Sequence, residues 1–505
     1  MYKKIIYLIS FFLVSQVLAQ PLPSDSWVTR HYMYMIGTGE GWVINNLFKP
    51  IDLNDIMNWS QTYDTAPSQW IMNDLYRYAQ QIQKQEMNEK NNILIYGWTG
   101  VRGQSGISEQ KGEKNNWGSL YSYNHIRYKN FNASIYFRAA SDPDVLPGFT
   151  PHSRDVRRLG MNSGEFDQAI LQYRNNWLTL QFGRGRQVWG PDYQNNLLLT
   201  SRSAAYDHFM AGVRYKQFQG TFFTGFLESV YDGFQFQNRY IVGHGIQYSD
   251  KSNFLLSLSE ITVYYGPDRS LDLAYLNPIL PHLEVELNDR GNCPYSDKNY
   301  ANSVWIISTD WLLPYRFRVS GSFLIDEIQF DQEDREQGRT DALAYNLHLS
   351  KSFVGEKSAV IINGGYDHVG TYTFRHENPY TSFVSRELPL GIPLGSDFYR
   401  FSTGVQWITP LRMVFSAAYN YIEQGENNVL DHLFDPYSEF IKIDFPSGMV
   451  TQKQIFSFEM LYSFRPSMEL KVLYDHCKEQ YAGQNESWYR FLVQLKLHYE
   501  YGFTF

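Results

Sequence analysis

The sequence predicts an all-β fold, a transmembrane antiparallel β-barrel of about 18 strands with a small N-terminal α-helical periplasmic region. Three observations predict it. From residue 93 onward apolar and polar residues alternate with a period of two, as in strands that have one apolar face. The connections between these segments alternate between short and long, which is the outer-membrane pattern. The chain is 17% aromatic but only 19% charged, and no stretch after residue 20 is long and apolar enough for a transmembrane helix.

The balance of charges and the cysteine count exclude several classes of protein. The 505 residues include 52 acidic and 44 basic side chains, a formal net charge of −8, and an acidic chain is a poor partner for nucleic acid. The high aromatic content excludes a disordered chain. Two cysteines are too few for a disulfide scaffold or a structural zinc site.

Residues 1–19 are organised like a secretory signal peptide. Lys3 and Lys4 precede a short apolar stretch, and Val17 and Ala19 occupy the small-residue positions of a cleavage site. Removal of Lys3 and Lys4 with this peptide leaves 42 basic against 52 acidic side chains, so the mature chain has a charge near −10. Together with the barrel pattern, export predicts location in the outer membrane.

Residues 20–92 are predicted to form a helical region in the periplasm. Between Pro67 and Asn88 one helical face is apolar, and a shorter helix is predicted to begin at Asp52. The apolar face consists of Ile71, Leu75, Tyr78 and Ile82. Because a lone helix of this length is marginal in water, we expect it to pack against the rim and lower lumen of the barrel.

The barrel is predicted to span residues 93–505, and its last strand shows the pattern most clearly. One face of that strand is apolar, and the residues between are mostly polar. The apolar face consists of Phe491, Val493, Leu495, Leu497, Tyr499, Tyr501, Phe503 and Phe505. A soluble β-sandwich is the alternative, but its strands rarely run this long. An aromatic C-terminal strand also resembles the C-terminal signal of bacterial outer-membrane barrels.

Counting backwards from the C-terminus gives eighteen strands. The predicted strands are 488–505, 467–477, 455–465, 412–421, 398–408, 359–366, 341–353, 315–325, 303–311, 254–264, 240–248, 221–229, 211–217, 177–182, 165–173, 131–139, 119–128 and 93–101. The connections assigned to the periplasm are short. The long connections assigned to the outside are 140–164, 183–210, 265–302, 367–397 and 422–454. An even count places both ends of the barrel in the periplasm.

The sequence carries none of the usual motifs for catalysis or cofactor binding. Neighbouring residues of a strand point to opposite faces, so an Asp-His dipeptide cannot form a catalytic dyad. Such dipeptides occur at Asp207-His208, Asp367-His368, Asp431-His432 and Asp475-His476. The histidines also lack metal-ligand spacing. We therefore predict no catalytic residue, no cofactor and no metal site, and hence a protein that is not an enzyme.

Two of the long loops carry the candidate saccharide-binding residues. Paired arginines offer bidentate donors for carboxylates or hydroxyls, and aromatic rings offer an apolar face on which a sugar ring can stack. The candidates are Arg184, Arg186, Trp189, Asp192, Asn378 and Tyr380. Aromatic residues mixed with arginine, asparagine and aspartate also suit the packing of loops against one another, so both interpretations stay open.

Three loop segments, Gly183–Asp192, Tyr275–Pro278 and Glu377–Asp397, together resemble the capsule assembly protein Wzi family. The signal peptide, the helical N-terminal piece and the terminal Phe505 agree with the resemblance. It implies an 18-stranded outer-membrane barrel with a helical periplasmic region. It also implies a surface lectin that tethers capsular or other exported polysaccharide to the outer membrane. The expected partners are that polysaccharide and outer-membrane lipid, with export machinery left open.

We therefore expect a non-catalytic protein that binds, assembles or anchors capsular or other exported polysaccharide at the cell surface. The alternative, from a different class, is a porin-like channel for small solutes, and a barrel enzyme is a third interpretation. Which saccharide is bound, the oligomeric state, and whether the lumen is plugged stay open. The topology brings Cys293 and Cys477 to the same end of the barrel in an oxidising compartment, and whether they pair stays open too.

Overall fold

The computed structural model describes most of the chain from Leu22 onward. The described residues are 22–40, 42, 45–49, 73, 77, 93–109, 114–192, 194–267, 269–288, 300–329, 336–376, 378–434 and 441–504. The predicted signal peptide, 1–19, lies outside them, and so does the apolar face predicted for the helix 67–88. Within the described residues no helix combines the length and the apolar composition needed to cross a membrane.

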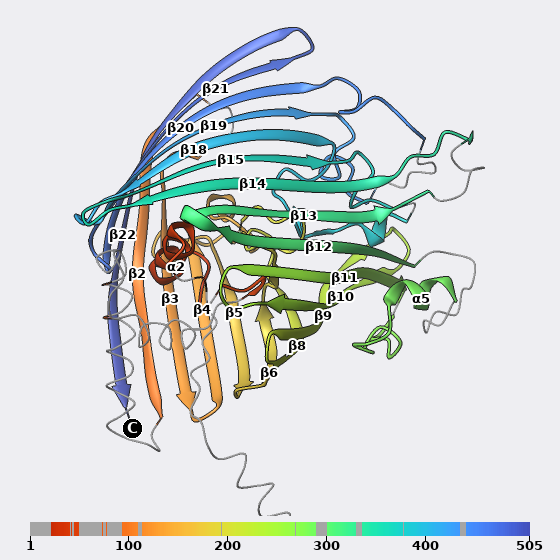
Figure 1. The fold of residues 1–505 in the computed structure, drawn as a ribbon, viewed down its shortest axis with the longest axis horizontal. Helices are drawn as coiled ribbons and strands as arrows, with labels where there is room; N and C mark the ends of the chain where they lie inside the picture. The colour runs from red at the N-terminus through yellow and green to blue at the C-terminus, as the bar shows by residue number, and fades with distance from the viewer. Residues whose placement is uncertain are drawn as a thin grey trace, which may run out of the picture.

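Eighteen antiparallel strands form one closed barrel, as predicted (Figure 1). The strands are β2 (Leu94–Ser108), β3 (Trp117–Tyr128), β4 (Phe131–Ala140), β5 (Ser163–Arg174), β6 (Leu178–Gly185), β8 (Tyr206–Tyr215), β9 (Phe218–Tyr231), β10 (Phe236–Ser249), β11 (Phe254–Pro267), β12 (Ala301–Leu313), β13 (Phe317–Glu327), β14 (Ala342–Val354), β15 (Ala359–Val369), β18 (Phe398–Ile408), β19 (Met413–Gln424), β20 (Thr451–Arg465), β21 (Met468–Tyr481) and β22 (Gln484–Thr504). Each predicted segment overlaps one of them. β22 pairs with β2 and closes the barrel, so every one of these strands has two neighbours.

The connections sort by length between the two ends of the barrel. At one end, which we call the turn end, two to four residues join neighbouring strands. At the other end, the loop end, the connections are 109–116, 141–162, 186–205, 232–235, 268–300, 328–341, 370–397, 425–450 and 482–483. Leu94 and Thr504, where the barrel begins and ends, pair with each other at the turn end. The five long connections predicted for one end of the barrel are therefore confirmed, whereas 232–235 and 482–483 at that end are as short as the turns at the other end.

Several strands extend further toward the loop end than the sequence predicted. β21 and β22 run on to the pair Tyr481↔Gln484, so a two-residue turn joins them. Ala482 and Gly483 in that turn have φ values of 49° and 78°, the backbone that a two-residue hairpin needs. The residues near this turn are mostly polar on both faces and carry no alternation, but their backbones still form the ladder of hydrogen bonds.

The faces predicted for the last strand are confirmed. Phe491, Leu495 and Phe503 are exposed on the outer face of β22. Lys496 is only 7% exposed and points into the lumen, where its ammonium donates to the backbone carbonyl of Asp25 at 3.2 Å.

One helix, α2 (Trp27–Thr38), lies inside the barrel (Figure 1). The hydroxyl of Ser26 accepts a hydrogen bond from the amide of Thr29 and caps its start, and Gly39, with φ 78°, ends it. The sequence indicated a helical region here but did not single out this helix, because its apolar side chains are not confined to one narrow stripe. Its buried residues are Trp27, Val28, Thr29, Tyr32, Met35, Ile36 and Thr38.

The apolar core lies inside the barrel at two levels. Near the turn end, α2 packs against inward-facing side chains of the wall. This cluster includes Trp27, Tyr32, Met35, Ile36, Tyr96, Trp98, Tyr123, Ile361 and Leu461. Nearer the loop end, side chains from two inward-folded loops pack against another part of the wall. That cluster includes Phe48, Trp189, Leu197, Leu198, Ile241, Val263, Phe383, Leu390 and Ile392.

Whether Cys293 and Cys477 pair stays a prediction. Cys477 lies in β21, where it is buried. Cys293 lies outside the described residues.

Candidate functional site: the filled lumen and the loop end

The plug segment, which we define as residues 22–49, joins opposite walls of the barrel. On one side the guanidinium of Arg30 pairs with Glu469 of β21 at 2.5 Å. On the other side the hydroxyl of Ser352 in β14 donates to the backbone carbonyl of Thr38 at 3.2 Å. These contacts hold α2 across the lumen near the turn end.

Asp25, just before α2, links the plug segment to two strands of the wall. Its carboxylate accepts from Arg102 and from the hydroxyl of Tyr136, both at 2.9 Å. Burial acts to raise the pKa of Asp25, but the positive charges of Arg102, Lys496 and Arg138 outweigh burial and hold the pKa below its ordinary value. Asp25 is therefore ionised at neutral pH and ties the plug segment to the wall.

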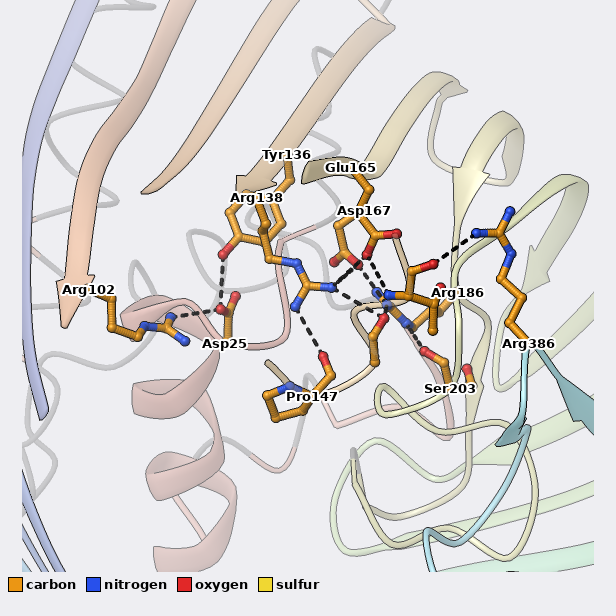
Figure 2. A network of polar contacts seen from close by, with 12 residues as sticks. Asp25, Arg102, Tyr136, Arg138, Pro147, Glu165, Asp167, Arg186, Ser203 and Arg386 are labelled. Carbon is orange, nitrogen blue, oxygen red and sulfur yellow. Dashed lines mark hydrogen bonds and ion pairs between the residues drawn. The ribbon is translucent and has the colours of Figure 1, made fainter. Parts of the chain in front are cut away.

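The polar network in Figure 2 continues from the wall to the loops. Arg138 pairs with Asp167, and Asp167 also pairs with Arg186 at 2.7 Å. Arg186 donates to the backbone carbonyls of Ser203 at 2.5 Å and Gly148 at 2.6 Å. Arg186, one of the predicted saccharide-binding residues, thus fastens two loop-end connections to the barrel wall.

Trp189, another predicted site residue, is buried between the plug segment and the wall. It belongs to β7 (Val188–Trp189), which pairs with β1 (Phe48–Lys49). Its ring centroid lies 4.6 Å from that of Phe48 and 5.1 Å from that of Phe223. The ammonium of Lys49 donates to the backbone carbonyl of Asp192 at 3.3 Å, and burial lowers the pKa of Lys49 to about 8.

The two inward-folded loops also pack against each other. The amide of Thr200 donates to the carbonyl of Leu390 at 3.0 Å, and the amide of Ile392 donates to the carbonyl of Leu197 at 3.3 Å. Gly391 permits this approach, because a Cβ atom there would lie 2.0 Å from the carbonyl oxygen of Leu197. Backbone contacts of this kind fix the height at which the loops close over the lumen.

A fully buried arginine anchors the second of these loops. Arg239 of β10 donates to the backbone carbonyls of Tyr380 at 2.6 Å, Ser382 at 2.6 Å and Val384 at 3.0 Å. It also pairs with Glu228 of β9. Tyr380, a predicted site residue, is thus held through its backbone.

The remaining predicted site residues lie in three different settings. Arg184 lies on the outer face of β6 and pairs with Asp207, which is more than half exposed, at 2.8 Å. The carbonyl of the Asn378 side chain accepts from the amide of Tyr380, and its amide group donates to the hydroxyl of Tyr265. The structure brings Trp189 and Asp192 together around Lys49, and Asn378 and Tyr380 together in one turn.

Part of the lumen forms a polar cavity of about 470 Å³ between α2, the 186–205 loop and the wall from β13 to β19. Its lining includes the carboxylate of Asp192 and is rich in amides and hydroxyls, among them Asn195, Asn196, Ser320, Asn346, Ser350, Asn363, Ser402, Gln406 and Asn420. Its arginine and histidine side chains have acidic partners. Arg318 pairs with Asp310 at 2.7 Å, while Arg400 at 2.9 Å and His348 at 3.0 Å pair with Asp367. The cavity suits water or small hydroxylated molecules.

A short basic hairpin projects at the loop end. In this arginine hairpin, residues 154–162, the amide of Arg154 donates to the carbonyl of Asn162 at 2.8 Å, and Arg158 pairs with Met161. The basic side chains Arg154, Arg157 and Arg158 are all exposed, with the acidic Asp155 between them. Their guanidinium groups are open to an anionic ligand.

Comparison with known proteins supports the fold. No protein-family model and no curated protein matches the chain. Among solved structures, Wzi of Escherichia coli matches with a TM-score of 0.60 and 13% sequence identity, over 96% of this chain and 99% of that one. The fold of the chain is the Wzi fold. Wzi is described as an outer membrane protein involved in group 1 capsule assembly and as a carbohydrate binding β-barrel.

Other solved barrels are similar over less of the chain than Wzi. OccD3 of Pseudomonas aeruginosa matches with a TM-score of 0.44 and 9% identity, over 80% of this chain and 91% of that one. OccAB1 of Acinetobacter baumannii matches with a TM-score of 0.43 and 10% identity, over 82% and 97%.

Sequence reasoning missed the residues that assemble the Wzi fold from within. Asp25, Asp167 and Arg239 bind the plug segment and the loops to the wall. Arg239 stands in the inward phase of β10, where a charged residue is also normal on a wetted wall. Asp167 lies at a bulge of β5, between the pairs Phe137↔Phe166 and Tyr136↔Gln168, where the period of two is interrupted. Nothing in the sequence indicated which groups either side chain contacts.

Proposed function

We propose that the chain is an outer-membrane protein that binds exported polysaccharide and anchors it at the cell surface. The observation that carries the proposal is the filled lumen. The plug segment and two inward-folded loops occupy the barrel with packed apolar side chains at two levels, which suits a surface-binding protein better than a conduit. The Wzi fold, seen in a carbohydrate binding β-barrel, supports the same class of function.

The exposed ligand surface of this proposal is the arginine hairpin. The six residues predicted from the sequence then fall into three groups. Arg186 and Trp189 position loops from buried sites, while Arg184 and Asp192 remain candidates for direct contact, at the outer face and at the cavity. Asn378 and Tyr380 shape the turn that lies over Arg239.

An acidic polysaccharide fits this surface. The chain as a whole carries −8, so its long-range field repels a polyanion. That repulsion is screened beyond about 8–10 Å at physiological salt. At contact, guanidinium groups can form charge-assisted and bidentate hydrogen bonds with carboxylates, so a local arginine group can still bind the polymer.

The proposal predicts a loss of binding when the hairpin loses its charge. Arg154, Arg157 and Arg158 are replaced together by alanine, and binding of acidic exported polysaccharide from the native cell is measured on purified, detergent-solubilised protein. We expect affinity to fall at least about tenfold, equivalent to about 1.4 kcal/mol. The matched control replaces Lys216, Lys251 and Lys357 by alanine, which removes the same charge from exposed positions at the turn end.

The two variants distinguish a site from a general charge effect. Equal losses in both would assign binding to the overall charge of the protein and contradict a site at the arginine hairpin. Absence of polysaccharide binding by the unmodified protein would contradict the proposed function itself.

A porin-like channel is the second candidate, and the polar cavity is the observation that favours it. A cavity of about 470 Å³ lies within the size range of sites for small ligands. A channel, however, needs a continuous polar path through the barrel. Single-channel recording in planar bilayers separates the two functions, because a filled lumen gives low conductance and a channel gives stable, open steps.

A further inference from the structure

One loop-end connection folds back over the outer face of the barrel. We call its described part, residues 269–288, the strap. The strap includes the short helix α5 (His282–Leu287), which Figure 1 shows beside the ends of β10, β11 and β12. The ring of Tyr275 stacks on that of Tyr264 with 4.4 Å between centroids and 9° between planes. The guanidinium of Arg269 lies 4.8 Å from the centre of the Tyr264 ring.

The strap presents an apolar surface to the outside. Leu273, Ile279 and Leu287 are between 75% and 87% exposed. They extend the apolar outer face of the barrel, on which Leu256 and Leu258 of β11 are also exposed. Polar groups between the strap and the wall are therefore shut off from water and need partners within the protein.

Three such groups meet under the strap. Glu260 follows Leu256 and Leu258 on the same face of β11, and it is fully buried. One of its carboxylate oxygens, Oε2, lies 3.1 Å from Nε2 of His244 in β10 and 3.9 Å from Nδ1 of His282 in α5. The three ligand atoms all lie within 4.8 Å of one another.

The two histidines are poorly satisfied by hydrogen bonds. His282 is fully buried, yet neither of its ring nitrogens has a hydrogen-bond partner among the described residues. The backbone of Tyr275 approaches the ring but stays outside hydrogen-bonding geometry. Nδ1 of His244 is also without a partner there. A buried polar atom left unpaired is uncommon and costly in a folded protein.

We propose that His244, Glu260 and His282 bind one divalent transition-metal ion of the zinc type. Two imidazole nitrogens and one carboxylate are a ligand set that zinc prefers, with a fourth position left for water. The metal would give an imidazole nitrogen of His282 the partner it lacks and link the strap to β10 and β11. Its role is structural, and the proposal is independent of the polysaccharide function.

Glu260 supports both the helix and the metal. Its Oε2 accepts from the amide of His282 at 2.7 Å and its Oε1 from the amide of Leu283 at 3.0 Å. These bonds fix the carboxylate in place and account for the start of α5. They do not provide a partner for the ring nitrogens of His282, whereas a bound metal would. The three residues lie far apart in sequence, so ligand spacing did not indicate them.

The test is metal content of the full chain, purified in detergent without chelator from cells grown with zinc. Elemental analysis should find about one zinc per chain. Protein stripped with chelator and dialysed should bind zinc again with one-to-one stoichiometry, and its thermal midpoint should rise on zinc addition. His282→Ala and Glu260→Gln should each lose zinc, whereas His476→Ala, which changes a histidine on β21, should keep it.

His282→Ala separates the metal from the helix cap, because backbone amides donate both capping hydrogen bonds and only the imidazole ligand is lost. Glu260→Gln keeps one oxygen that can accept from a backbone N–H, and an amide oxygen is a much weaker metal ligand than a carboxylate. If a variant fails to insert, the titration of the stripped unmodified chain decides alone. Absence of zinc in the unmodified protein together with no saturable zinc binding would overturn the proposal. Retention of full zinc binding by correctly inserted His282→Ala would overturn it as well.

Discussion

At the scale of single residues, arginines inside this barrel hold several segments together through hydrogen bonds and ion pairs. Arg186 meets one carboxylate and two backbone carbonyls, and Arg239 meets three carbonyls and Glu228. The flat guanidinium carries donors in a fixed fork, so a single side chain can hold several segments at set distances. Arg184 differs, because it pairs with the exposed Asp207 on the outer face.

This difference predicts opposite results for two neighbouring substitutions. Arg186→Ala removes one partner of the buried Asp167, and breaking a buried pair costs about 3–5 kcal/mol. Arg184→Ala removes a partly exposed pair, worth about 0–1 kcal/mol. We expect Arg186→Ala to lower the urea midpoint and to expose the 186–205 loop to protease, while Arg184→Ala leaves both unchanged.

The measurement is urea unfolding together with limited proteolysis of the purified variants. The same comparison is needed to interpret binding data. A loss of polysaccharide binding in Arg186→Ala could come from disturbed loop packing as well as from a lost contact with the polysaccharide. Equal stability of the two variants would contradict the fastening role assigned to Arg186.

At the scale of elements, strands were predictable and the loop and plug contacts were not. The period of two located every barrel strand. One face of each strand faces lipid, so the alternate residues that lie on that face are mostly apolar. The contact of Thr200 with Leu390 joins backbones that are distant in sequence, and no local pattern records such a pairing. Sequence reasoning named Arg186 and Trp189 as candidates for saccharide binding. It could not predict their burial, because that depends on how the loops fold inward.

The strand faces give a test at this scale. Leu497 belongs to the outward phase of β22, and Gln494 belongs to the inward phase, where its amide donates to Gln104 at 3.4 Å. Leu497→Arg places a charge on the outer face, at a cost of about 2–4 kcal/mol near the membrane midplane. We expect it to reduce insertion into lipid vesicles strongly, and Gln494→Ala to reduce it little. Similar insertion of both would contradict the assigned faces.

At the scale of the whole molecule, the plug segment fills part of the lumen of the eighteen-stranded barrel. It contacts β2, β4, β21 and β22 on one side and β14 on the other. The loops close the lumen nearer the loop end through the second apolar cluster. We expect both the plug segment and the loops to be needed for a closed lumen, so the conductance of the barrel depends on both.

Because the plug segment occupies the lumen, we expect the barrel to have a low ion conductance that moderate acid does not change. The pKa of Asp25 lies below its ordinary value, so its stabilising contribution is present above the unfolded value of about 3.9. That contribution is lost only as the pH falls through the still lower folded value. Reconstituted full-length protein should therefore show the same low conductance at pH 7 and at about pH 4.

Asp25→Ala combined with Arg30→Ala removes the attachments of α2 to β2, β4 and β21 and should raise conductance at both pH values. The control, Asp155→Ala with Arg157→Ala, changes the same residue types on the exposed arginine hairpin and should leave conductance low. High conductance of the unmodified protein would instead favour the channel. If the double variant stays as low as the control, the loops alone close the lumen, and the plug segment serves chiefly to pack the core near the turn end.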